Sequence, residues 1–412
     1  MTALDEPLHL SHGAPLLNRI AKAAMEELLA APGQLPGDEL FTLYRRWAAG
    51  GAGLLITGHV MIDGRAVAQP GDVVLEQDTP LEPFQRWAAV GKSAGGRIWM
   101  QINHPGRVVP RDLADTTWAP SAVSIGAGRF SSMYPTPQPM SDQEIAETVE
   151  RFAVTARRAQ QAGFDGVEIH AAHGYLLSQF LSPLVNQRDD HWGGSLRNRA
   201  RLLLDVVSAV RERVGTAFAV GVKLNSADFQ RGGFDTGDAR DVIKMLADEG
   251  ADLVELSGGS IESLATSGPG FTADGRTLAR EAYFLELAKE LVVTSPLPLL
   301  LTGGIRRRAV AQEVIDSGFA VAGVASALAV DPTLPEQWLA GSDDAQGHPA
   351  RSRLRDKMLA AAAVQAVTTR RLARLAAGKS SKTPYSPAVA LLLERLLRAR
   401  RRRGYRKWLT AA

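Results

Sequence analysis

Eight short apolar segments rich in β-forming residues recur along the chain, and most of them are separated by stretches with helical patterning. They are Arg19–Met25, Gly53–Val60, Arg97–Asn103, Gly166–His170, Ala219–Leu224, Leu253–Ser257, Leu299–Thr302 and Val321–Ala325. Near-continuous apolar strands are typical of a parallel sheet that is buried on both faces. Eight alternations of strand and helix therefore predict an α/β fold, a single (β/α)8 TIM barrel. The alternative is a doubly wound sheet, which usually binds its cofactor at a Gly-rich first turn, and no G-x-G-x-x-G motif follows the first segment.

Several of the intervening helices have readable ends. Ser141 and Glu144 form the pattern of a capping box, which predicts a helix that stops near Gly163. Thr79-Pro80 has the pattern of an N-cap followed by proline in the first helical position. Other helices are predicted over Asp38–Ala49, Ser195–Val214, Gly237–Glu249 and Leu278–Val292.

The end of the chain differs from the rest in charge. Residues 341–412 hold 17 of the 47 basic residues and 4 of the 44 acidic ones, so residues 1–340 hold 30 and 40. The high isoelectric point is therefore a property of the tail, and it gives no reason to expect nucleic acid as a partner. We predict two parts, a barrel over residues 1–340 and a basic helical extension over residues 341–412. The extension would contain a helix, a linker and a leucine-rich helix, over Met358–Leu375, Lys379–Pro387 and Pro387–Arg403.

Two interpretations of the final helix stay open. A leucine-rich helix that ends in a run of arginines is typical of peripheral contact with a membrane surface or of an arm that binds nucleic acid. The alternative is a helix docked on the barrel or on a second copy in a homo-oligomer. We favour this alternative because runs of charge are common at the solvated ends of helices.

The chain contains no cysteine. This excludes disulfides, thiolate metal sites and cysteine-held iron–sulfur clusters, and it fits a reducing compartment. No basic n-region precedes an apolar h-region at the start, and no apolar run is long enough to cross a bilayer. We therefore expect a soluble cytoplasmic protein.

Polar residues follow most of the predicted strands, where a barrel of this kind carries its chemistry. They include Thr57, Gly58, His59, Gln101, Asn103, His104, His170, His173, Tyr175, Lys223, Asn225, Ser257, Ser260, Gly303 and Gly304. The loop over residues 104–140 is long and rich in proline and serine, and loops of that length in a compact domain are usually functional, so we interpret it as a lid.

One strand delivers His170, His173 and Tyr175 to a single loop. Two neutral imidazoles suit a role as donors to a carbonyl oxygen, since each keeps one N–H, and a phenol can give a proton to a nearby carbon. For the two histidines, the alternatives are a metal-binding pair or histidines buried in the core. For Tyr175, the alternative is an amphipathic tyrosine of the core. Because the pattern forces no third ligand nearby, we predict no metal here.

Five segments carry a resemblance to a known family. They are Asn18–Ile20, Gln101-Ile-Asn-His-Pro-Gly-Arg107, His170–Tyr175, Asn186–Gly194 and Thr302-Gly-Gly304. Together they resemble the old yellow enzyme family, which comprises FMN-dependent ene-reductases and related NADH:flavin oxidoreductases on a single (β/α)8 barrel. The resemblance spans about residues 5–340, and the two-histidine-plus-tyrosine loop is its strongest signal.

The resemblance implies a role for each matched residue. His170 and His173 would bind the oxygen of a small-molecule substrate, and Tyr175 would be the proton donor. Lys223 would lie beside N1 and the C2 carbonyl of FMN. The remaining cofactor contacts would come from Ala23, Ala24, Met25, Gly58 and Gln101 at the ring and from Gly303, Gly304, Ala325 and Ser326 at the phosphate.

Four positions depart from the family's usual residues. Lys223 and Ser326 stand where arginine is common, and lysine lacks the bidentate fork of arginine. Arg306 is placed to compensate for Ser326 at the phosphate. Glu26 stands where relatives carry Thr or Cys, close to the C4 carbonyl of the flavin, unless its side chain turns away into the following loop. His59 is also unusual, and we expect it to reach towards the substrate.

The resemblance implies an FMN-dependent oxidoreductase that takes hydride from NADH or NADPH and reduces an activated C=C bond, as in an α,β-unsaturated carbonyl compound. One alternative is a barrel lyase that forms a Schiff base through Lys223. Another is a degenerate flavin-binding barrel whose basic tail binds a partner or a membrane.

Overall fold

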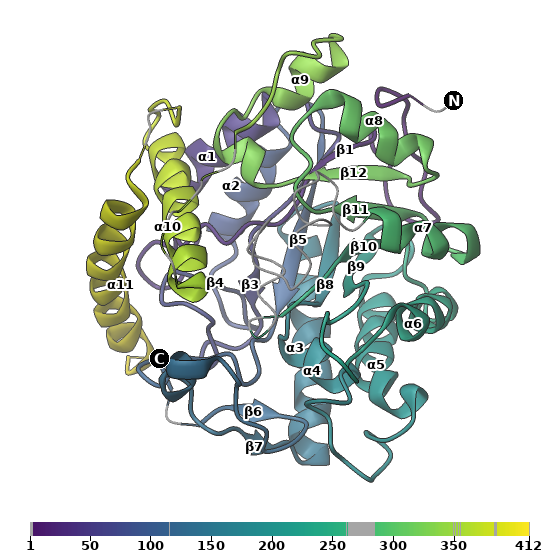
Figure 1. The fold of residues 1–412 in the computed structure, drawn as a ribbon, viewed down its shortest axis with the longest axis vertical. Coiled ribbons are helices and arrows are strands. Elements are labelled where there is room, and N and C mark those ends of the chain that lie inside the picture. Colours follow the sequence, from purple (N-terminus) through teal and green to yellow (C-terminus); the bar gives the residue numbers. More distant parts are fainter. Residues whose placement is uncertain are drawn as a thin grey trace.

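The eight predicted strands form a closed parallel barrel (Figure 1). The computed structural model describes residues 3–114, 116–260, 262, 285–348, 350, 352, 354, 356–382 and 385–411. The barrel strands are β1 (Ile20–Lys22), β2 (Leu54–Ile56), β5 (Arg97–Asn103), β8 (Gly166–Ala171), β9 (Ala219–Asn225), β10 (Leu253–Ser257), β11 (Leu299–Thr302) and β12 (Val321–Val324). Each pairs in parallel with the next in this order, and β12 returns to β1. The prediction of a (β/α)8 barrel is confirmed, because a doubly wound sheet would have two open edges.

Trp99 on β5 fills part of the barrel interior. It is 1% exposed and packs with apolar side chains from several other strands. A Cβ added to Gly166 or to Gly221 would lie 2.7 or 2.8 Å from the Trp99 ring, so these glycines provide the space for it. This part of the interior is a packed core, and polar chemistry is left to the carboxyl ends of the strands.

Nine helices of the described chain belong to the barrel and its connections: α1 (Asp38–Ala48), α2 (Glu82–Gly91), α3 (Asp142–Gln161), α4 (Leu176–Leu181), α5 (Leu196–Val214), α6 (Thr236–Asp248), α7 (Leu285–Thr294), α8 (Arg308–Asp316) and α9 (Leu334–Leu339). The predicted capping box of α3 is present, with Ser141 Oγ accepting from the Glu144 N–H. The predicted cap at Thr79 is wrong: α2 begins at Glu82, and Thr79 Oγ1 instead accepts from the Glu76 N–H. The helix expected from Leu278 begins at Leu285 in the described residues, and 278–284 lie outside them.

The second predicted strand is split in two. It was expected over Gly53–Val60, but β2 ends at Ile56, and β3 (Val60–Met61) begins after a bend at residues 57–59. β3 pairs with the far end of β5 and with β4 (Val73–Val74). The bend thus places His59 between the barrel rim and this small extension of the sheet.

The long loop over residues 104–140 is anchored beside the barrel. It contains β6 (Trp118–Ala119), the 3-10 helix η1 (Gly128–Met133) and β7 (Gln138–Pro139). The buried Arg107 guanidinium donates to the carbonyl oxygens of Val123 and Ser124 and to Glu262. These contacts fold the loop back on itself beside the rim.

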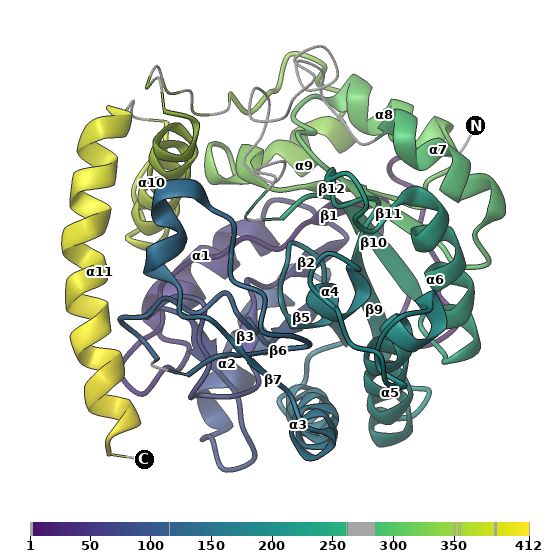
Figure 2. The ribbon, with the colours of Figure 1, turned by 60° about the horizontal axis from the view of Figure 1, so that its bottom comes forward.

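The C-terminal extension forms two helices side by side, α10 (Lys357–Ala376) and α11 (Pro387–Leu409) (Figures 1 and 2). α10 packs on α1, and α11 reaches the barrel through Tyr405, whose buried hydroxyl donates to the Gly64 carbonyl oxygen at 2.9 Å. Arg398 and Arg402 contact Asp112 of the long loop. The final helix is therefore docked, as the favoured interpretation held, although Val389, Leu392, Leu393 and Leu396 remain exposed. None of the described helices has the length and apolar character needed to cross a membrane.

Candidate functional site

His170, near the end of β8, lies beside His173 and Tyr175 of the loop that follows. The two imidazole ring centroids are 5.0 Å apart with planes at 82°, and the rings of His170 and Tyr175 have the same spacing and angle. His173 has a φ of 62°, in the left-handed region that disfavours most side chains, and its N–H donates to Asn225 Oδ1 at 3.2 Å. This turn brings together the three side chains that the sequence singled out.

Both histidines are kept neutral by their surroundings. Burial lowers the pKa of His170 well below its ordinary value, and the neighbouring His173, Lys223 and His59 lower it further. Burial and the positive charges of Lys223 and His59 do the same to the pKa of His173. His170 Nδ1 accepts from the Ala172 N–H, so a neutral His170 carries its proton on Nε2. His173 Nε2 is 2.8 Å from Ser257 Oγ, which orients the second ring.

Tyr175 lies at the start of α4, where the long loop meets the strand ends. Burial raises the pKa of its phenol well above the ordinary value, and the carboxylates of Glu26 and Asp72 add to this effect. Gln179 fixes the backbone on both sides, since its amide nitrogen donates to the carbonyl oxygens of Pro105 and Gly174. Because its pKa is raised, the phenol of Tyr175 stays protonated at neutral pH.

Lys223 lies inside the rim, in register with His170 on one neighbouring strand and with Glu255 on the other. Its ammonium group forms a buried ion pair with Glu255. Gln101 donates to Glu168 Oε2 at 2.6 Å. Burial, and secondly the charge of Glu255, raise the pKa of Glu168 well above its ordinary value.

Glu27 is a functional neighbour that the sequence reasoning missed. Its buried carboxylate accepts from the Tyr44 hydroxyl at 2.6 Å and from the Gly58 N–H at 3.1 Å, and it lies 3.6 Å from the Lys22 ammonium. A Cβ on Gly58 would come within 1.8 Å of this carboxylate, so only glycine fits. The cluster fixes the backbone that leaves β1 through residues 23–25, but it also occupies the Gly58 N–H.

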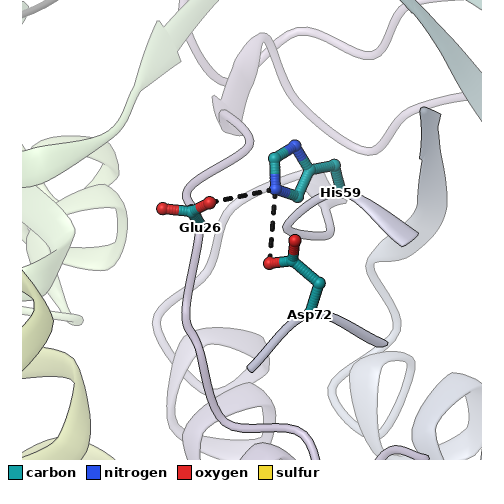
Figure 3. Close-up of side chains that lie close together, drawn as sticks. All are labelled: Glu26, His59 and Asp72. Atoms are coloured by element: carbon teal, nitrogen blue, oxygen red, sulfur yellow. Dashed lines mark hydrogen bonds and ion pairs between the residues drawn. The ribbon is translucent and has the colours of Figure 1, made fainter. Parts of the chain in front are cut away.

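Glu26, His59 and Asp72 form a second polar cluster (Figure 3). His59 Nε2 lies 3.3 Å from Glu26 Oε1 and 3.5 Å from Asp72 Oδ1. Burial alone lowers the pKa of His59, but the carboxylates of Asp72 and Glu26 outweigh it and raise the pKa to about 10. The His59 ring lies beside Tyr175, at 5.5 Å between centroids, so it does line the predicted substrate side. Its two nitrogens, however, are engaged by Asn103 and by the carboxylates.

The predicted phosphate residues meet at one edge of the barrel. β11 and β12 are neighbours in parallel register, so Gly303-Gly304 and Ala325-Ser326 follow adjacent strand ends. Gly303 and Gly304 have φ values of 134° and 75°, which residues with a side chain rarely adopt. Without a Cβ, their backbone N–H groups can be approached closely. The start of the C-terminal extension closes on this edge, since the Gly347 N–H donates to the Arg306 carbonyl oxygen.

Comparison with known proteins places the chain in context. Residues 3–344 match the model of the NADH:flavin oxidoreductase / NADH oxidase family. The NADH-dependent flavin oxidoreductase iliE of Hypocrea jecorina (strain QM6a) is 36% identical over 350 residues, which cover 80% of this chain and 87% of that protein.

Two solved structures extend the comparison. A 2-naphthoyl-CoA reductase in complex with 2-naphthoyl-CoA has a TM-score of 0.74 at 25% identity; the alignment covers 84% of this chain but only 53% of that one, so this chain spans about half its length. An old yellow enzyme homologue from Zymomonas mobilis has a TM-score of 0.71 at 25% identity and covers 87% and 96% of the two chains. The family match ends at residue 344, so α10 and α11 lie outside it.

Proposed function

The chain belongs to the NADH:flavin oxidoreductase / NADH oxidase family, and from that membership we propose that it reduces an activated C=C bond, such as that of an α,β-unsaturated carbonyl compound. It is an NADH- or NADPH-dependent flavin oxidoreductase with FMN as its cofactor. The C=C specificity rests on the geometry of His170, His173 and Tyr175.

The residues at the rim fit FMN. The side-chain amide of Gln101 donates to Glu168, so the Gln101 side-chain oxygen is left to accept from the flavin ring. Lys223 would supply an ammonium group beside the ring. At the other end, Gly303-Gly304 offers an open backbone to the phosphate, and Ser326 offers a hydroxyl in place of a charged side chain. Residues 23–25 would line the ring. When bound, FMN supplies the hydride that it has taken from NADH or NADPH.

His170 and His173 bind and orient the carbonyl oxygen of the substrate. This oxygen becomes negative as hydride reaches the β-carbon, and preorganised donors away from water typically stabilise such charge by about 2.7–4 kcal/mol for one donor. The neutral state of both rings matters, because each then holds an N–H that is not shared with a carboxylate. The buried ring of His170 holds this donor at Nε2.

Tyr175 gives the second hydrogen, as a proton to the α-carbon. Its phenol is 5.0 Å, ring centroid to centroid, from the imidazole that holds the substrate oxygen. The raised pKa keeps the proton on the oxygen until the carbon has become basic enough to take it.

The test separates the two half-reactions in the purified FMN-bound protein. Anaerobic NADH or NADPH should bleach the yellow flavin, and 2-cyclohexen-1-one should restore its colour. Tyr175→Phe should leave the bleaching rate unchanged but slow recolouring by the enone by a factor of roughly 10² to 10⁴, the usual contribution of a general acid. Tyr134→Phe, which alters another tyrosine packed in the same apolar cluster, is the matched control and should change neither rate.

Two results would count against the proposal. An enone rate that is unchanged in Tyr175→Phe would remove this residue from proton transfer. A wild-type protein whose reduced flavin reacts with dioxygen but with no enone would limit the function to NADH oxidation.

A further inference from the structure

We propose that Glu26, His59 and Asp72 form a binding site for one divalent transition-metal ion, and we take Zn²⁺, which binds histidine and carboxylate ligands, as the ion to test. The metal hypothesis considered from the sequence concerned His170 and His173 instead. The three residues come from three segments: after β1, in the bend after β2, and just before β4 (Figure 3). The proposal does not depend on the reaction proposed above.

Two of the three spacings between the ligand atoms fit a tetrahedral ion. Bonds of 2.0–2.2 Å at tetrahedral angles place neighbouring ligand atoms about 3.3–3.6 Å apart. His59 Nε2 lies 3.3 Å from Glu26 Oε1 and 3.5 Å from Asp72 Oδ1, and all three atoms lie within 4.8 Å of one another. Two carboxylates and one imidazole leave the fourth position for water or another small ligand.

Asp72 points an unsatisfied oxygen into this cluster. The residue is 3% exposed, and its Oδ1 has no hydrogen-bond partner in the part of the chain that the structure describes. Its Oδ2 is held by the Gln69 N–H at 2.7 Å, so Oδ1 is fixed in direction. Oδ1 makes a long ion pair of 3.5 Å with His59 Nε2, and a metal ion bound directly to this oxygen would compensate its buried charge better.

Asn103 supplies the outer partner that a metal-bound histidine needs. Its amide group lies 3.2 Å from His59 Nδ1, and its Oδ1 is buried without a hydrogen-bond partner among the described residues. A rotation of the Asn103 amide group by 180° would let Oδ1 accept from Nδ1–H. Nε2 would then bind the ion in place of the proton that it carries in the ion pair, and a histidine ligand whose other nitrogen donates to an oxygen is the usual pattern.

A small cavity adjoins the three ligands. It has a volume of about 10 Å³, which is roughly the room that one water molecule needs, and Glu26, His59 and Asp72 all contribute to its wall, together with Gly58 and Gly71. A Cβ on Gly71 would lie 2.9 Å from the Leu28 carbonyl oxygen, so this glycine keeps the backbone close on that side. The cavity gives room for the ion's fourth ligand.

The site would form part of the wall of the substrate pocket. The His59 ring lies 5.5 Å from the Tyr175 ring and 6.4 Å from the His170 ring, measured between centroids. Binding of an ion would therefore fix the ring on which Tyr175 packs.

The experiment measures Zn²⁺ binding to the FMN-bound protein after treatment with a chelator. Equilibrium dialysis with elemental analysis should find one Zn²⁺ per chain with micromolar or tighter affinity. X-ray absorption should show only nitrogen and oxygen ligands near 2.0–2.2 Å, with the scattering pattern of one imidazole. Asp72→Asn, which keeps the shape but removes the charge, should weaken binding at least tenfold. Glu26→Gln, a change at a more exposed side chain, should do the same if Asp72→Asn folds poorly.

His191→Ala is the matched control, because His191 is exposed and far along the chain from the cluster. It should leave the stoichiometry and the affinity unchanged. Equal binding by the wild type, Asp72→Asn and Glu26→Gln would overturn the proposal. The absence of Zn²⁺ binding in the micromolar range would overturn it as well, and the cluster would then be an ion pair between His59 and the two carboxylates. Neither result bears on flavin reduction, so failure here is distinct from failure of the proposed reaction.

Discussion

Replacing Lys223 with methionine removes the only ammonium group bonded to Glu255 among the described residues. Lys223 is 3% exposed and Glu255 is fully buried. Burial is also the first cause that raises the pKa of the neighbouring Glu168 well above its ordinary value. Removing one partner of a buried pair typically costs about 3–5 kcal/mol, because the other charge is left without compensation. For 412 residues, an unfolding entropy of about 2 cal/mol/K per residue converts this cost into a fall in Tm of roughly 3–6 °C.

The assay is a double-mutant cycle by calorimetry on flavin-free protein, since Lys223 is also expected to bind FMN. Lys223→Met and Glu255→Gln should each lower the Tm by several degrees. The double variant should lose much less than the two effects together, because it buries no unpaired charge. Lys244→Met is the control: its ammonium is about half exposed and 3.7 Å from Asp241, so its loss should cost under about 1 kcal/mol.

Additivity would refute this reasoning. If the loss in the double variant equals the sum of the two single losses within about 0.5 kcal/mol, the two residues do not stabilise each other. Lys223 would then be a buried cation held by the site as a whole.

Two further predictions concern the phosphate site and the C-terminal helix. Ser326→Arg should hold FMN at least as tightly as the wild type in fluorescence titration, because a guanidinium beside Gly303 adds a charge-assisted hydrogen bond; weaker binding would mean that the phosphate lies elsewhere. Hydrogen bonds from Arg398, and its charge, lower the pKa of Asp112 to about 2. The ion pair therefore stabilises the fold above about pH 4 and loses its effect as the pH falls towards 2. Asp112→Asn should cost at most about 1 kcal/mol of stability near neutral pH, since the carboxylate is partly exposed. The difference in Tm from the wild type should shrink on acidification. A difference in Tm that does not change with pH would exclude the charge as its cause.

Much of the fold and of the reacting loop follows from the sequence. Continuous apolar runs identify buried parallel strands, and the ends of such strands meet at one rim. His170, Lys223 and Glu255 are therefore brought together by strand register alone, which needs no knowledge of side-chain conformation.

The cluster around His59 was beyond sequence reasoning for a physical reason. After β1 the chain is irregular, so the alternation that tells inward from outward side chains is lost. As a result Glu26 and Glu27, adjacent in sequence, enter different clusters, one with His59 and the other with Gly58. Asp72 approaches His59 only because the bend at residues 57–59 sends the chain through β3 and back to β4.

The contacts that dock α11 could not be read from its composition. Docking was the favoured interpretation, but nothing in the sequence identified Asp112, which lies 286 residues before Arg398, as the carboxylate that Arg398 and Arg402 contact. No local pattern encodes a contact over such a separation. Arg400 and Arg403 are exposed, as is usual for a run of charged residues.

The charges around the substrate loop serve two purposes at once. Lys223 and His59 lower the pKa of His170, which keeps it a neutral donor. The same two cations would favour negative charge on an oxygen held by that donor, because they act in a buried region where water screens them little. Each cation is balanced by a carboxylate, Lys223 by Glu255 and His59 by Glu26 and Asp72. Replacing Lys223 with methionine should therefore weaken binding of an anionic substrate analogue, measured by titration, and should also let His170 take up a proton more readily.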